Sequence, residues 1–385
     1  MSATAVLTSW LAAAAGVPAP AAVAGIARAW VPKVWVLNGD SVSPVYAVRH
    51  VAGRAIKLPC DQPSSLAITP NGRILYVGCT DTVIPISAAT GRAGRAIHIG
   101  PGVDQIVITP NGRTAYVGAN STVVPISTSA NHAGKPIKVA RRGDGPLELG
   151  ITPNGKTVYS VNSVTVVPIA TRTNKAGKPI YTGPNFLSMV ISPDGKTAYV
   201  LGAGNSVVPI NTATNRAGRP IVVGAGTAYA FAMAITPDGK TIYVPDFYAS
   251  TVVPVSTVTK TASKPIKVGP NPVSVVVTPN GKTVYVVTGN AIYPINTATN
   301  RAGKPVRVGF EPGWIVVTPN GKTAWVSGDI WTGSGFNRVG QGYVLPINTV
   351  TNRPGKRVKV GKNSECLIMK PWRSGDAYGP SSCPP

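Results

Sequence analysis

The chain has 385 residues, of which 37 are Lys or Arg and 13 are Asp or Glu, so its formal net charge is +24. A charge balance of this kind is unusual for a cytosolic housekeeping enzyme and favours contact with polyanions. The 42 Gly and 37 Pro residues fall at fixed places in a repeating unit, which excludes a low-complexity disordered chain.

An Ala-rich leader precedes the repeats. Met1 to Ala29 is rich in Ala and Val and resembles the apolar region of a secretion signal followed by small residues. A basic segment before that region is missing, so the start codon is misplaced or the leader is not a signal. Its prolines, at positions 18 and 20, and its short apolar runs argue against a membrane-spanning helix. We expect export.

A unit of about forty residues then repeats almost to the end of the chain. In the copy at 274–309, runs rich in Val, Ile and Thr alternate with turns, which predicts four short antiparallel strands. Such a unit is typical of a β-propeller blade, so the predicted fold class is all-β. The tripeptide Pro-Asn/Asp-Gly marks seven copies, separated by 40, 43, 40, 44, 42 and 40 residues, at Pro70, Pro110, Pro153, Pro193, Pro237, Pro279 and Pro319.

The number of blades follows from the fourth-strand segments, which resemble AGKPIKVG. They begin at eight places: Ala52, Ala93, Ala133, Ala176, Ala217, Ala262, Ala302 and Pro354. The repeats start with second and third strands at 34–37 and 41–46, and the missing first strand is found at 366–371. We therefore predict eight four-stranded antiparallel blades, with the ring closed by pairing of the N- and C-terminal strands. Seven blades are the alternative.

One feature of the unit is unusual for a sheet. Every third strand carries a proline, which cannot donate to a ladder, so we predict a bulge or a ladder gap repeated eight times. The predicted domain boundaries are a leader at 1–32, the propeller at 33–375 and a tail at 376–385.

The repeat resembles the YVTN family of β-propeller proteins. The resemblance lies in the TPNGKTVYV segment, the Val-Val/Ile-x-Ile third strand and the TATNRAGKPIKVG connection, and it covers about residues 34–374. It implies the propeller fold, and it implies cell-surface or extracytoplasmic roles. It implies no particular activity, because function lies in sites rather than in the fold.

Basic residues concentrate in two kinds of turn that strand order places at one end of the propeller, the lower face. The cations proposed to contact a polyanion are Arg73, Arg113, Lys156, Lys196, Lys240, Lys282, Lys322, Lys135, Lys178, Arg219, Lys264 and Lys304. We hypothesise a non-enzymatic, exported, monomeric binding module whose basic lower face holds cell-wall polymer, nucleic acid or lipid headgroups. The alternative is that repeat duplication copied a turn preference for Lys and Arg beside Asn-Gly. The tyrosines that recur at one position of the predicted second strands are interpreted as part of the core between blades.

The opposite end, the upper mouth, carries residues that do not repeat. The ligand candidates there are Asp61, Asp104, Glu148, Asn185, Tyr229, Glu311, Trp314 and Glu365. An enzyme or ligand-binding protein that uses this acidic mouth, with Ca²⁺ held by carboxylates, is a second hypothesis. No His falls at the mouth, and no catalytic set, metal-ligand cluster or cofactor motif emerges. A third hypothesis is a protein–protein scaffold that uses the insertion at 326–342.

The four cysteines form an even set, which permits two disulfides in an oxidising compartment. Cys60 precedes a first strand and Cys79 ends the following second strand, so we predict that they pair. A second disulfide, Cys366–Cys383, would pin the tail near the ring closure. Four free thiols in a reducing cytosol are the alternative.

Overall fold

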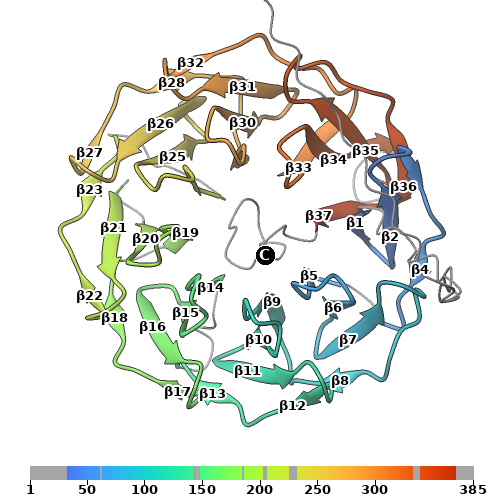
Figure 1. The fold of residues 1–385 in the computed structure, drawn as a ribbon, viewed down its shortest axis with the longest axis vertical. Coiled ribbons are helices and arrows are strands. Elements are labelled where there is room, and N and C mark those ends of the chain that lie inside the picture. Colours follow the sequence, from blue (N-terminus) through green and yellow to red (C-terminus); the bar gives the residue numbers. More distant parts are fainter. Residues whose placement is uncertain are drawn as a thin grey trace, which may run out of the picture. The chain divides into compact units, whose positions relative to one another are not determined.

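A computed structural model describes residues 33–60, 63–141, 145, 148–183, 186–202, 206–224, 232–332 and 339–369. These residues form eight antiparallel sheets that stand around a ring as the blades of a β-propeller (Figure 1). None of them lies in a helix long and apolar enough to cross a membrane. The predicted leader and the predicted tail lie outside the described residues, so the domain boundaries stay a prediction.

The first strand of each blade is the one nearest the centre of the ring (Figure 1). For blades 1 to 8 these strands are β37 (Ser364–Met369), β5 (Ser65–Ile68), β9 (Val103–Ile108), β14 (Glu148–Ile151), β19 (Phe186–Ile191), β24 (Ala234–Ile235), β29 (Ser274–Val277) and β33 (Glu311–Val317).

The second and third strands are the most regular parts of each blade, because their β-branched residues are buried on both faces between neighbouring blades. The second strands are β1 (Lys33–Asn38), β6 (Ile74–Gly78), β10 (Thr114–Ala119), β15 (Thr157–Val161), β20 (Thr197–Gly202), β25 (Thr241–Asp246), β30 (Thr283–Val287) and β34 (Thr323–Thr332). The third strands are β2 (Ser41–Tyr46), β7 (Thr82–Ser87), β11 (Thr122–Ser127), β16 (Thr165–Ala170), β21 (Ser206–Asn211), β26 (Thr251–Ser256), β31 (Ile292–Asn296) and β35 (Val339–Asn348).

The fourth, outermost strand is broken in two. The pieces nearer the third-to-fourth turn are β3 (Val51–Ala52), β12 (His132–Ala133), β17 (Lys175–Ala176), β22 (Arg216–Ala217), β27 (Thr261–Ala262) and β32 (Arg301–Ala302). The pieces that follow are β4 (Ile56–Lys57), β8 (Ile97–His98), β13 (Ile137–Lys138), β18 (Ile180–Tyr181), β23 (Ile221–Val222), β28 (Ile266–Lys267) and β36 (Val358–Lys362).

The break lies at the third-strand proline, so the predicted ladder gap is confirmed. In blade 3, Pro125 has no N–H to donate to the fourth strand. Its carbonyl still accepts a hydrogen bond, from the N–H of Gly134 at 2.7 Å. A Cβ on Gly134 would lie 3.2 Å from Pro125 Cγ, so the close approach favours glycine. The same backbone bond to the proline carbonyl recurs in all eight blades, and blade 6 uses Ser263 as the donor. The gap therefore belongs to the unit itself.

The ring closes through blade 1, as predicted. β37, from the end of the chain, pairs antiparallel with β1, and Val36 lies opposite Leu367; Figure 1 shows the red strand beside the blue ones. Blade 8 braces the closure, because Asp329 accepts hydrogen bonds from the Ser364 N–H at 3.0 Å and the Ser364 hydroxyl at 3.1 Å. The insertion at 326–342 is mostly strand rather than loop, since it forms the extended ends of β34 and β35.

Apolar cores lie between neighbouring blades. The core between blades 3 and 4, for example, joins Tyr116 and Val123 to Val158 and Val167. The tyrosines of the second strands are buried in these cores, as predicted: Tyr76, Tyr116, Tyr159, Tyr199, Tyr243 and Tyr285.

Candidate functional site

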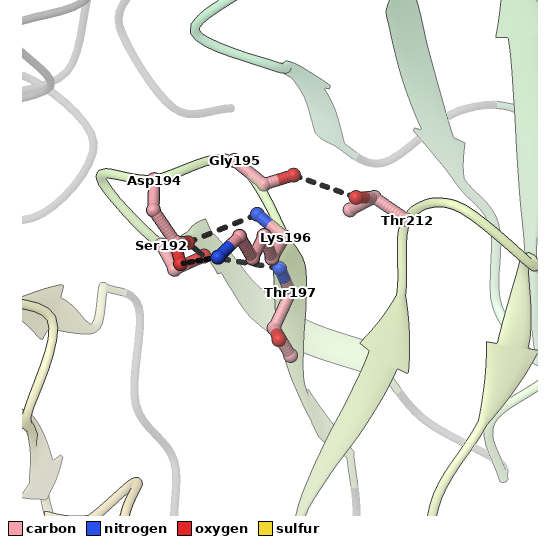
Figure 2. Close-up of polar contacts among 6 residues, drawn as sticks. All are labelled: Ser192, Asp194, Gly195, Lys196, Thr197 and Thr212. Atoms are coloured by element: carbon pink, nitrogen blue, oxygen red, sulfur yellow. Dashed lines mark hydrogen bonds and ion pairs between the residues drawn. The ribbon is translucent and has the colours of Figure 1, made fainter.

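The turn between the first and second strands is held by a small polar network, drawn for blade 5 in Figure 2. Asp194 Oδ1 accepts the Ser192 hydroxyl at 2.6 Å and the Lys196 N–H at 3.0 Å, and the Thr197 N–H donates to Ser192 Oγ at 3.0 Å. The hydrogen bonds that Asp194 accepts lower its pKa, and the bond from the Ser192 hydroxyl has the largest effect. Gly195 has a φ of 70°, which the left-handed turn requires.

The third-to-fourth turn lies against the first-to-second turn of the same blade. The Thr212 hydroxyl donates to the Gly195 carbonyl at 2.6 Å (Figure 2), and an equivalent threonine in blade 3, Thr128, donates to Gly112 at 2.5 Å. The two basic turn classes therefore share one end of the blade, as the strand order predicts. All twelve cations predicted to contact a polyanion are exposed there.

The turn cations are exposed, as Lys196 illustrates. The Lys196 side chain is 83% exposed and lies 3.8 Å from Asp194, its neighbour in the turn. What the network fixes is the backbone N–H of each turn lysine or arginine, while the charged end extends into solvent. Basic residues also occupy the outermost strands, so positive charge is not confined to the lower face.

The upper mouth contains a carboxyl group of different character. Glu148, the first residue of β14 in blade 4, accepts the N–H of Met189 in blade 5 at 2.9 Å. Burial raises the pKa of Glu148 to about 8, although the bond from Met189 opposes that rise. Glu148 is half-buried, and the raised pKa favours its protonated form more than that of an exposed carboxyl.

Glu148 belongs to a series of hydrogen bonds between successive inner strands. Gln105 in β9 accepts the N–H of Leu149 in β14, and Ser188 Oγ in β19 accepts the Met233 N–H at 2.9 Å. The three acceptors Gln105, Glu148 and Ser188 occupy one register position, five residues before the turn proline of their blade. That spacing is the sequence signal that could have identified Gln105 and Ser188 as partners of Glu148.

A second carboxyl lies beside this series. Asp104 precedes Gln105 in β9, on the strand next to β14, and burial raises its pKa as well. The Gln105–Leu149 hydrogen bond thus joins the two residues that follow Asp104 and Glu148 in their strands. The structure brings two predicted mouth residues onto adjacent inner strands, and both favour the protonated form more than an exposed carboxyl does.

The other predicted mouth residues have different positions. Glu311 is exposed at the start of β33, and Trp314 packs against the core of blades 1 and 2. Asp61, Asn185 and Tyr229 lie outside the described residues, as does the side chain of Glu365.

Within the described part of the chain, no three His, Cys, Asp or Glu residues lie close enough together to hold a metal ion. The Ca²⁺ form of the second hypothesis therefore has no described ligand set. The predicted disulfide Cys60–Cys79 is present, with a Cα–Cα distance of 6.3 Å. Cys366 is buried, and Cys383 lies outside the description, so that pairing stays a prediction.

Comparison with known proteins places the chain among solved propellers. Hydrazine synthase of Kuenenia stuttgartiensis matches with 22% identity and a TM-score of 0.53, over 70% of this chain and 90% of that one. The dihydro-heme d1 dehydrogenase NirN, in complex with DHE, matches with 14% identity and a TM-score of 0.69, over 86% of this chain and 75% of that one. No family model and no curated protein matches. At these identities the likeness shows the fold, an eight-bladed β-propeller.

These matches correct the first functional hypothesis. We expected a non-enzymatic binding module for an anionic polymer, but the two matched proteins described above are named for enzymes. The hypothesis inferred a function from the number of lower-face cations, and net charge alone does not define a function. These cations are solvated side chains on a repeated turn whose geometry depends on their backbone N–H groups.

Proposed function

We propose that the protein is an enzyme or ligand-binding propeller that acts at its upper mouth, with the Glu148 carboxyl as hydrogen-bond and proton donor. The observation that carries this proposal is the contact between the half-buried Glu148 carboxyl of blade 4 and the Met189 N–H of blade 5, together with a pKa raised to about 8. A buried carboxyl with a strongly raised pKa is a common feature of active sites, where a neutral acid is needed near pH 7.

The donor could serve a carbonyl, carboxylate or ether oxygen of a ligand. One Glu148 oxygen accepts from Met189, so the carboxyl is held in place while its proton is available on the other oxygen. Asp104, on the adjacent inner strand, is the candidate second group, because burial raises its pKa as well.

The matched solved structures support a small-molecule site. Hydrazine synthase and the NirN dehydrogenase are named for reactions on small molecules, and NirN was solved with a bound DHE. A dihydro-heme or haem is therefore a sensible first probe for this chain.

We also propose an extracytoplasmic location and membership of the YVTN-type repeat family. The Cys60–Cys79 disulfide favours an oxidising compartment. The family proposal rests on the TPNGKTVYV and TATNRAGKPIKVG segments of the repeat.

The test is a ligand screen by thermal shift with a panel of small organic acids, carbonyl compounds and haem at pH 6.5. Wild type is compared with Glu148→Met, which keeps a side chain of similar length but cannot donate a hydrogen bond, and with Glu311→Gln, which removes an exposed carboxyl from β33. We expect a ligand that stabilises wild type and the Glu311 variant and loses most of its shift with the Glu148 variant. A ligand that stabilises all three equally places the site elsewhere, and no shift from any compound rejects the proposal for this panel of ligands.

A further inference from the structure

Five first-to-second turns carry the dipeptide Asn-Gly, the sequence in which an asparagine side chain most readily loses its amide group. Glycine has no side chain to shield its backbone nitrogen, so that nitrogen can reach the amide carbon of the asparagine before it. The five asparagines are exposed to water: Asn71, Asn111, Asn154, Asn280 and Asn320. Blades 5 and 6 carry Asp194 and Asp238 at the same position.

The folded turn holds both reacting groups in other bonds. In blade 3, Asn111 Oδ1 accepts the Thr109 hydroxyl at 2.7 Å and the Arg113 N–H at 3.0 Å, so the amide cannot rotate freely. The Gly112 nitrogen would be the nucleophile, but its N–H donates to the Thr109 carbonyl at 2.7 Å. The same three bonds recur in the other four asparagine turns. Loss of the amide therefore requires the turn to open first.

The carboxylate that this reaction produces is already present in two blades. Asp194 Oδ1 accepts the Ser192 hydroxyl and the N–H of the lysine that follows the glycine (Figure 2). Asp238 accepts the equivalent pair of bonds in blade 6, from the Thr236 hydroxyl and the next lysine N–H. An aspartate formed from asparagine therefore fits the turn, whereas an isoaspartate, which adds a carbon to the backbone, does not.

We propose that the five Asn-Gly turns are modification sites for hydrolytic deamidation, which the folded blade keeps closed. When a turn opens, the glycine nitrogen gives its proton to solvent base and bonds to the asparagine Cγ, and the side-chain amide nitrogen leaves as ammonia. Water then opens the cyclic imide at either carbonyl, which gives aspartate or isoaspartate. Each event replaces a neutral amide by a carboxylate and lowers the net charge at that end of the blade by one.

The repeat supplies matched controls within one molecule. Thr109→Val keeps the shape of the side chain but removes the hydroxyl that donates to Asn111 and accepts the Thr114 N–H at 3.1 Å. The other four asparagine turns are unchanged in this variant. Wild type and variant are incubated at mildly alkaline pH, folded or in guanidinium chloride with reductant, and peptide mass spectrometry follows the loss of ammonia at each turn.

We expect each turn of folded wild type to lose its amide at least about tenfold more slowly than in the unfolded chain, because opening breaks several hydrogen bonds. In folded Thr109→Val, Asn111 should react about fivefold faster than in wild type, the effect of one ordinary hydrogen bond, while the other four turns keep their rates. Equal rates in folded and unfolded wild type overturn the proposal.

An unchanged or slower rate at Asn111 in the variant also overturns it, because the hydroxyl would then not hold the turn closed. A variant that unfolds would accelerate all five turns together, so the ratio measured in wild type is the independent test. Asn111→Asp should keep the melting temperature of wild type, and a lower value would contradict the fit of the product. None of these results depends on Glu148, so the proposal can fail without affecting the mouth hypothesis.

Discussion

The hydroxyl of Tyr116 donates a hydrogen bond to Asn174 Oδ1 at 2.6 Å and so ties blade 3 to the turn of blade 4. Asn174 is in the left-handed region, with a φ of 52°, which Asn tolerates better than most residues. The same bond joins Tyr76 to Asn131 at 2.6 Å and Tyr159 to Asn215 at 2.8 Å. The contact is thus a repeated latch between neighbouring blades.

The first prediction concerns this latch. Tyr116→Phe and Asn174→Ala should each destabilise the ring, and a double-mutant cycle should give a coupling energy of about 1 kcal/mol, the usual net value of such a bond. The cycle cancels the separate cost of placing alanine in the left-handed region at 174. Chemical denaturation of the four proteins measures it. Additive single effects would show that the latch contributes only packing.

The second prediction compares two glycines with the same backbone and different neighbours. Gly155 and Gly321 have φ values of 67° and 69°, so alanine costs about 1 kcal/mol of left-handed strain at either. A Cβ on Gly155 would lie 2.9 Å from Pro110 Cδ in the preceding blade, whereas one on Gly321 would lie 3.6 Å from Pro279 Cδ. Gly155→Ala should therefore lower the melting temperature more than Gly321→Ala. Equal losses would mean that the turns move apart freely.

The third prediction concerns the disulfide of blade 2. Cys60 and Cys79 are 19 residues apart in sequence, and closing a loop of this length contributes about 3 kcal/mol in the chain-entropy model. Cys60→Ala should lower the free energy of unfolding by about that amount, and reductant should then have less effect on the variant than on wild type. Thermal scans with and without reductant, with thiol counting by mass, measure it. An unchanged stability would mean that the bond constrains little of the unfolded chain.

The repeated features of this fold could be predicted from the sequence because the residue pattern of each one recurs in several blades. Eight fourth-strand segments gave the number of blades, and the C-terminal run at 366–371 supplied the missing first strand of blade 1. The ladder gap followed from the missing N–H of Pro125 and its equivalents. The partner of the tyrosine hydroxyl could not be predicted, since Tyr116 and Asn174 are 58 residues apart and come together only through blade packing.

The candidate site was predictable only in part. Asp104 and Glu148 were identified as mouth residues, but the raised pKa of each and the hydrogen bond between Glu148 and Met189 of the next blade belong to single blades, so the repeat pattern does not show them. The number of turn lysines drew the functional hypothesis to the lower face, because net charge is visible in a sequence while desolvation of one carboxyl is not. Residues that occur once, such as Glu148, are therefore the basis of the site proposed here.

The fourth prediction follows from the pKa of Glu148. Burial raises the pKa of this carboxyl from 4.5 to about 8. Between these two pH values, Glu148 holds a proton in the folded protein that it has lost in the unfolded chain. The resulting stabilisation relative to the charged form is complete below about pH 4.5 and is lost as pH rises through about 8. A shift of this size corresponds to a few kcal/mol.

Wild type should therefore lose stability between pH 5 and pH 8 relative to Glu148→Gln, whose side chain does not titrate. The difference between the two unfolding free energies isolates this carboxyl from all others, because every other group is common to both proteins. Urea denaturation at half-unit pH steps measures it, and Glu311→Gln, on the exposed end of β33, serves as the control. Parallel profiles for wild type and Glu148→Gln would show that the carboxyl is ionised at neutral pH, and the proton donor proposed for the mouth would be lost with it.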